Sequence, residues 1–292
     1  MGYKFFCLFK KFAFGTFLIL AFWSCTSDGE ENPSGDLAAL DLYDQSYGSD
    51  PIQTMDVYLP AGRSMEKTPL LIYIHGGAWI DGSKEEFTSF REDLSKSFPG
   101  YAFISLNYSL FNANTGQDPF PAQQADVLKA ITYISKKTAE WKISDTIVLS
   151  GASAGGHLAL LHAYKNKRIG NIKAVIAFFP PTDLAKLYDS SLFTEIGLNA
   201  LLGGSPQTNP DGYAINSPIT YINPSSPPTI FFHGTTDNIV PLSQSELLEQ
   251  ALLEAQVTHE FVQVPNQGHG FTDQTYPILF NQAADFIEKV IE

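Results

Sequence analysis

A serine enclosed by small residues carries the clearest chemical signal in the chain. Ser153 lies in the motif GASAG at residues 151–155, directly after the β-branched run at residues 146–149. A serine hydroxyl is a poor nucleophile at neutral pH, so it needs a neighbouring base and an exposed position. A sharp turn from a strand into a helix supplies that exposure, and small flanking residues let the backbone turn tightly. The motif therefore predicts a nucleophilic serine, with an ordinary strand–helix turn as the alternative.

Two further side chains could activate this serine. Asp237 lies in a loop after the apolar run at residues 228–232, and His269 is flanked by glycines in a later loop. In such a system the histidine acts as the base and the carboxylate orients it. The order Ser153, Asp237, His269 differs from the orders found in chymotrypsin and subtilisin. Asp183, which also follows an apolar run, is the alternative acid, although its position equally suits a helix cap.

The remaining histidines are interpreted as structural. His157 follows Ser153 too closely to act as its base, so it is expected to pack around the site. His75 is expected to shape a glycine loop, and His233 to end a strand. His162 is predicted to lie on the surface.

Backbone N–H groups could hold a developing negative charge. Gly76 and Gly77 follow the buried-strand run at residues 69–74, and paired glycines leave their N–H groups unobstructed. Ala154 would supply another N–H group at the start of the helix that follows the serine. We predict that these three residues form an oxyanion hole, with a plain glycine turn as the alternative. Trp79 lies in the same loop, where it could line an acyl pocket or serve buried packing equally well.

Apolar runs and helical patterns alternate along the chain and would position these residues. This alternation predicts an α/β fold, in which a mostly parallel sheet is covered by helices on both faces. Residues 184–226 show no strand pattern. We interpret this insertion as short helices that form a partial lid, with Phe193 and Tyr213 among the roofing side chains and surface decoration as the alternative. The predicted strands are 52–59, 70–74, 102–106, 146–149, 172–179, 229–232 and 261–264, and the predicted helices are 85–96, 121–137, 156–165, 243–255 and 277–291.

Together these motifs resemble the α/β-hydrolase superfamily, in the branch of hormone-sensitive-lipase-like carboxylesterases. Within that branch the chain is most similar to the bifunctional acetylxylan esterase/feruloyl esterase-like (BD-FAE-like) group. The resemblance runs from about Tyr43 to the C-terminus and departs from many relatives at Ala78, where they carry a third glycine. The residues that carry it are His75–Trp79, Asn107-Tyr108, Gly151–His157, Ser217–Tyr221, His233–Asp237 and Gly268–Phe271.

The resemblance implies a serine carboxylic-ester hydrolase that forms an acyl-enzyme and needs no cofactor or metal. The implied substrates are short-acyl or hydroxycinnamoyl esters, including esters of plant polysaccharide. Trp79 and Tyr108 are the side chains expected to bind the substrate. Three alternatives use the same fold: a serine peptidase of the prolyl-oligopeptidase type, an arylformamidase, and a non-catalytic binding protein.

Charge and cysteine content exclude several classes of function. The net charge of −13 argues against binding to nucleic acid, which requires a basic face. The two cysteines, Cys7 and Cys25, both precede the predicted domain, so that domain has no disulfide, no cysteine nucleophile and no cysteine-ligated zinc. No phosphate-binding loop or paired His–Glu metal motif is found in the sequence.

The first residues resemble an export signal. A basic region and an apolar stretch at residues 12–23, which is too short to span a bilayer, precede Cys25. We predict a signal peptide with a lipoprotein-type cysteine over residues 1–25, a polar tether over 26–40 and the catalytic domain over 41–292. The protein is then expected to be exported and to be a lipid-anchored envelope or cell-surface protein of a Gram-negative bacterium. Membrane contact would come only through a lipid on Cys25.

Overall fold

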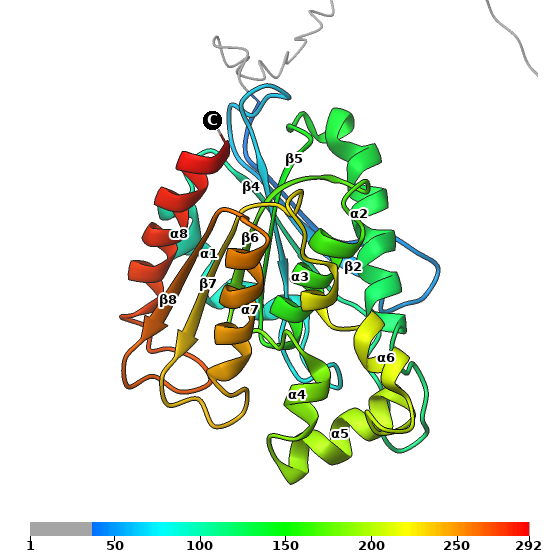
Figure 1. The fold of residues 1–292 in the computed structure, drawn as a ribbon. Coiled ribbons are helices and arrows are strands. Elements are labelled where there is room, and N and C mark those ends of the chain that lie inside the picture. The colour runs from blue at the N-terminus through cyan, green and yellow to red at the C-terminus, as the bar shows by residue number, and fades with distance from the viewer. Residues whose placement is uncertain (1–36, 292) are drawn as a thin grey trace, which may run out of the picture. The chain divides into compact units, whose positions relative to one another are not determined.

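The computed structural model describes residues 37–291, which are built around an eight-stranded sheet (Figure 1). The strands are β1 (Leu40–Ser46), β2 (Thr54–Leu59), β3 (Leu70–Ile74), β4 (Ala102–Leu106), β5 (Thr146–Ala152), β6 (Asn171–Phe178), β7 (Thr229–Gly234) and β8 (His259–Val264). Their order in the sheet is β1-β2-β4-β3-β5-β6-β7-β8. β2 runs antiparallel to β1 and β4, and every other neighbouring pair is parallel. This arrangement confirms the predicted fold class, the α/β-hydrolase fold.

The central strands follow the predicted apolar runs closely. β3 and β4 are buried along their whole length, because parallel strands covered on both faces require apolar side chains at every position. The sequence pattern misses β1, whose residues LDLYDQS are mostly exposed or half-buried. That pattern is typical of an edge strand, where one side of the strand and much of its surface meet water.

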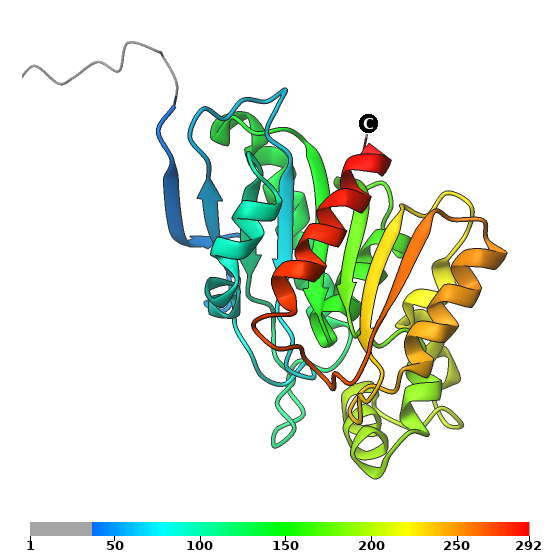
Figure 2. The same cartoon turned by 90° about the vertical axis from the view of Figure 1, so that its left-hand side faces the viewer.

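Helices cover both faces of the sheet (Figures 1 and 2). α1 (Arg91–Ser97) and α8 (Tyr276–Ile291) pack on one face, and α2 (Ala122–Trp141), α3 (Ala154–Lys165) and α7 (Ser243–Glu254) pack on the other. Successive side chains of a strand point to opposite faces. Accordingly, Leu70 and Ile72 join the core under α2 and α3, whereas Leu71 and Tyr73 join the core under α1 and α8.

The insertion at residues 184–226 consists of α4 (Leu184–Tyr188), α5 (Leu192–Leu202), α6 (Pro210–Ile215) and the 3-10 helix η2 (Pro218–Tyr221). All of its residues are described by the structure, and none forms a strand, as the sequence pattern predicts. Ser191 and Thr194 form a reciprocal capping box at the start of α5, and Gly203 ends the helix in the left-handed conformation. α4 and α5 lie beyond the carboxyl ends of the central strands (Figure 1).

The predicted signal peptide, Cys25 and most of the predicted tether lie outside the described residues. Within residues 37–291, no helix combines the length and the apolar character needed to cross a membrane.

Candidate active site

Ser153 lies at the turn between β5 and α3, in a backbone conformation that residues other than glycine rarely adopt. Its φ is 52° and its ψ is −121°, and its N–H group donates to the carbonyl of Phe178 at 2.9 Å. A Cβ atom at Gly151 would lie 2.5 Å from the carbonyl carbon of Gly155, and one at Gly155 would lie 2.0 Å from the carbonyl oxygen of Ile74. The turn therefore requires glycine at both positions, which explains the motif around the serine.

The structure brings Ser153, His269 and Asp237 into one hydrogen-bond chain. His269 Nε2 lies 2.9 Å from Ser153 Oγ, and His269 Nδ1 lies 2.7 Å from Asp237 Oδ2. The three residues follow β5, β7 and β8, whose carboxyl ends meet at the same edge of the sheet. A neutral ring that donates from Nδ1 to Asp237 presents Nε2 as an acceptor for the serine proton.

Asp183, the alternative acid, lies elsewhere. Its side chain accepts a hydrogen bond from the N–H group of Lys186 at 3.0 Å and caps α4. This position matches the helix cap that the sequence offered as the other interpretation. The geometry thus favours Asp237 over Asp183 as the partner of His269.

The Asp237 carboxylate is fully enclosed and accepts hydrogen bonds on both oxygens. Oδ1 accepts from the N–H groups of Ile239 and Val240 at 2.8 and 3.0 Å, and Oδ2 faces His269 and His233. Burial alone would raise the pKa of Asp237, but the hydrogen bonds from His233, His269 and Ile239 outweigh it and hold that pKa well below its usual range. Asp237 is therefore a permanent negative charge behind the His269 ring.

His233, expected only to end a strand, also holds the Asp237 carboxylate. Its Nε2 lies 3.2 Å from Asp237 Oδ2 and 2.8 Å from the carbonyl oxygen of Val240, while its Nδ1 lies 2.7 Å from Ser245 Oγ. A neutral ring with its hydrogen on Nε2 donates to the first two acceptors and accepts from the serine hydroxyl. His233 thus helps to fix the carboxylate, and the motif HGTTD, which places it four residues before Asp237, is its sequence signal.

The glycine loop after β3 has three consecutive residues with positive φ. These are Gly77 at 103°, Ala78 at 51° and Trp79 at 61°. A Cβ atom at Gly77 would lie 2.0 Å from the carbonyl oxygen of Asp81, so only glycine fits there. Gly77 and Ala78 border the cavity that contains Ser153, and Ala154 begins α3 directly after the serine.

One predicted oxyanion donor requires correction. The N–H group of Gly76 donates to the Glu86 carboxylate at 3.2 Å, because the side chain of η1 (Lys84–Ser89) reaches back to the loop. The same carboxylate accepts from the Tyr73 hydroxyl at 2.7 Å. Gly76 therefore shapes the loop, and the available donors are the N–H groups of Gly77 and Ala154. No local motif in the sequence marks Glu86 as part of this loop.

Tyr108 and Trp79, the two predicted substrate-binding residues, have different positions. Tyr108 is fully buried, stacks on His75 with ring centroids 4.2 Å apart and donates to the carbonyl groups of His75 and Gly76. Tyr108 therefore holds the backbone of the glycine loop through these hydrogen bonds, and it lines neither of the two cavities at the site. Trp79 is also mostly buried, and its indole N–H group donates to His157 Nδ1 at 3.3 Å. One face of its ring nevertheless lines a cavity.

The two histidines of α3 are both buried. His157 packs beside Trp79, as predicted, and its Nε2 lies 2.7 Å from the carbonyl oxygen of Asn216 in the insertion. Burial lowers the pKa of His157 to about 4, although the bond to Asn216 opposes this shift. The prediction that His162 lies on the surface is wrong, because α3 packs between the sheet and the insertion and buries almost every residue.

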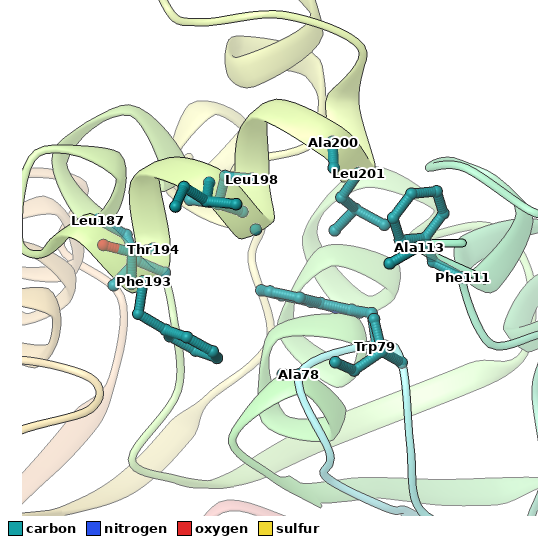
Figure 3. A pocket seen from close by; sticks show the side chains of 13 residues that line it. Ala78, Trp79, Phe111, Ala113, Leu187, Phe193, Thr194, Leu198, Ala200 and Leu201 are labelled. Carbon is teal, nitrogen blue, oxygen red and sulfur yellow. The ribbon is translucent and has the colours of Figure 1, made fainter. Parts of the chain in front are cut away.

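Two cavities meet at the site. The larger cavity, of about 750 Å³, contains Ser153 and His269 and is bordered by Gly77, Phe193 and Ile239. The smaller cavity, of about 230 Å³, lies between α5 and the loop that carries Trp79 (Figure 3). Within residues 37–291, no cluster of three histidine, cysteine or acidic side chains is arranged to hold a metal ion.

The chain is similar in sequence and in structure to known esterases. The chain is 27% identical over 247 residues to the esterase LipQ of Mycobacterium tuberculosis, covering 75% of this chain and 57% of LipQ. It spans about half the length of the curated relatives it matches. Among solved structures, a truncated carbohydrate esterase from gut microbiota has a TM-score of 0.73 and 26% identity, over 86% of this chain and 96% of that one. The bifunctional GH43-CE of Bacteroides eggerthii has a TM-score of 0.73 and 27% identity, over 86% of this chain and 38% of that one.

The family comparison gives the same assignment. The BD-FAE family model matches residues 55–252, which is more than half of the chain and includes Ser153 and Asp237. This match confirms the resemblance seen in the sequence motifs, and the chain belongs to the BD-FAE family.

Proposed function

We propose that the chain hydrolyses carboxylic esters through an acyl-enzyme formed on Ser153. The observation that carries this proposal is the hydrogen-bond chain from Ser153 through His269 to Asp237, with donors 2.9 and 2.7 Å from their acceptors. A nucleophile, a base and an orienting carboxylate in this geometry are the parts that acyl transfer needs. The esterases among the relatives add support.

Each residue has a defined part in the proposed reaction. His269 Nε2 takes the proton from Ser153 Oγ as the oxygen attacks the ester carbonyl. The N–H groups of Gly77 and Ala154 stabilise the oxyanion, and Asp237 stabilises the imidazolium. His269 then returns the proton to the departing alcohol. Water, activated by the same histidine, attacks the acyl-enzyme and releases the acid.

We propose short-acyl or hydroxycinnamoyl esters as substrates, including esters borne by plant polysaccharide. The carbohydrate esterase from gut microbiota and the bifunctional GH43-CE protein support this range of substrates, because each of the two matches covers 86% of the present chain. The large open cavity beside Ser153 can accommodate an ester attached to a bulky alcohol such as a sugar. We further propose that the protein is exported and anchored by a lipid on Cys25.

Substitution of the serine tests the mechanism. Ser153→Ala should lower kcat on a p-nitrophenyl ester by about a million-fold, as for the nucleophile of subtilisin. A fluorophosphonate probe should label the wild-type protein at Ser153 and leave the variant unlabelled. Labelling that survives in the folded variant would show that another residue is the nucleophile.

A further inference from the structure

The smaller cavity is lined almost entirely by hydrocarbon groups. Leu198 and Leu201 of α5 face Trp79 across it (Figure 3). The lining side chains contain two polar groups, the Trp79 indole N–H and the Thr194 hydroxyl. The indole N–H is bonded to His157, and the hydroxyl is bonded within the capping box of α5. A group that enters this cavity therefore meets no free hydrogen-bonding side chain.

The smaller cavity adjoins the larger one that contains Ser153. Ala78 and Phe193 line both this cavity and the larger one that contains Ser153. Ala78 directly follows Gly77, the proposed oxyanion donor. A substituent of an ester bound at Ser153 can thus pass Ala78 and enter the apolar space.

We propose that this cavity binds an unsubstituted hydrocarbon group of the ester, from either its acyl part or its alcohol part. The proposal rests on the ester hydrolysis proposed above and ranks the substrates within it. The cavity measures about 230 Å³. An engineered apolar cavity of about 150 Å³ binds benzene, so a phenyl ring or a short alkyl chain fits here. Exposed Phe193, at the junction of the two cavities, controls entry.

Hydrocarbon burial predicts how the rate depends on the substrate. Each methylene that enters the cavity should raise kcat/KM about fourfold, which is the transfer free energy of one methylene converted to a ratio. A hydroxyl group that enters without a partner should lower kcat/KM about tenfold. If the acyl part is the one that is bound, methyl cinnamate should therefore be hydrolysed faster than methyl p-coumarate, which differs from it by one ring hydroxyl.

Gly197 offers a direct way to fill the cavity. It lines the cavity from the interior of α5, and a Cβ atom built there meets no other atom within 4 Å. Gly197→Leu places a side chain in the free space and removes a helix-weakening glycine. Asn199→Leu is the matched control, because it adds the same side chain to an exposed position of the same helix that does not line the cavity.

The experiment varies the two parts of the ester separately. One series holds p-nitrophenol fixed and lengthens the acyl group from acetyl to hexanoyl, and the other holds acetyl fixed and lengthens the alkyl alcohol. In the wild-type protein and Asn199→Leu, kcat/KM should rise along one series, which identifies the part of the ester that is bound. Gly197→Leu should lower the hexanoyl-to-acetyl or hexyl-to-ethyl ratio at least tenfold.

Several results would overturn the proposal. The proposal fails if kcat/KM in the wild-type protein does not rise with chain length in either series. It also fails if kcat/KM rises with chain length and Gly197→Leu leaves that rise unchanged. When the acyl series is the one that rises, faster hydrolysis of methyl p-coumarate than of methyl cinnamate would also overturn it, and this measurement needs no variant. If ester hydrolysis requires Ser153 but kcat/KM does not depend on chain length, the proposed role of the cavity is refuted and the proposed ester hydrolysis stands.

Discussion

Removal of the Glu86 carboxylate, which borders the cavity beside Ser153, should impair the oxyanion loop that this carboxylate holds in place. Glu86 accepts from the N–H group of Gly76 at 3.2 Å and from the Tyr73 hydroxyl at 2.7 Å. Burial and the nearby Glu86 charge raise the pKa of Tyr73, which keeps this hydroxyl protonated as a donor. Glu86 is thus a positioning residue that fixes Gly76, and Gly77 is the next residue along the chain.

The size of the effect follows from the bonds that are lost. Glu86→Ala removes two hydrogen bonds to a charged group, each worth about 1.5–3 kcal/mol. A misplaced oxyanion donor costs about a hundredfold or more in kcat, because the oxyanion exists only in the transition state. We therefore expect kcat to fall about a hundredfold, with KM nearly unchanged. Glu86→Gln retains an oxygen for Gly76 and an amide for Tyr73, so its kcat should fall no more than about fivefold.

The assay is steady-state hydrolysis of p-nitrophenyl acetate, together with the melting temperature of each variant. Glu85→Ala is the matched control, because the exposed Glu85 carboxylate pairs with Lys84 and lies outside the cavity. Its kcat should equal that of the wild-type protein. Unchanged kcat in Glu86→Ala would refute the positioning role. Equal losses in Glu86→Ala and Glu86→Gln would instead assign the effect to charge.

Three other predictions concern the acid, the buried histidine and the N-terminus. Asp237→Asn should lower kcat about ten-thousand-fold, whereas Asp183→Asn should change only the melting temperature; the reverse result would assign the acid to Asp183. Burial lowers the pKa of His162 to about 4, and the hydrogen bond to the Ile169 carbonyl opposes this shift only weakly. Between pH 6.5 and pH 4, His162 therefore binds a proton in the unfolded chain but not in the folded chain. Stability should therefore fall by about 3 kcal/mol as pH falls through this window, and His162→Gln should flatten the curve of melting temperature against pH; equal slopes would exclude this cause. Cys25→Ala should release the protein from membranes, and a mature chain without lipid, identified by mass spectrometry, would contradict acylation.

Much of the fold was predictable because its central strands are buried on both faces. Such strands are continuous apolar runs bounded by turn residues, and they stand out in the sequence without any knowledge of their neighbours. β1 could not be predicted in this way, because it forms by pairing with β2 and leaves much of its surface in water. Its sequence, LDLYDQS, contains no run of apolar residues.

The catalytic candidates were predictable for a different reason. Ser153 lies between Gly151 and Gly155, which the tight turn requires, and His269 precedes Gly270, whose φ of 122° favours glycine. Both signals are local and visible in the sequence. Glu86 lies 10 residues from Gly76 along the chain, and only the packing of η1 against the loop brings them together. Nothing in the residues around Glu86 indicates this contact, so tertiary structure alone reveals it.

The burial of His162 has a signal in the sequence around it. The run from Ala154 to Tyr164 contains no charged residue, and all of it is buried. A surface helix shows one polar face, whereas a helix that is apolar all round is buried on every side. The absence of a polar face on α3 therefore predicts that its histidines are buried too.

Helix α5 of the insertion has two apolar faces. Leu198, Leu201 and Leu202 form the buried face of α5, which holds it against the rest of the insertion and the core. Phe193 and Ile196 form a second apolar face that is 65% and 62% exposed. A helix needs only one apolar face to pack, so packing does not account for the second face. Because Phe193 and Ile196 both line the apolar cavity next to Ser153, a ligand that excludes water from that cavity accounts for their character. Tyr213 contrasts with them: it is almost fully buried and bonded to the carbonyl of Gly204, so its substitution should affect stability and leave substrate preference unchanged.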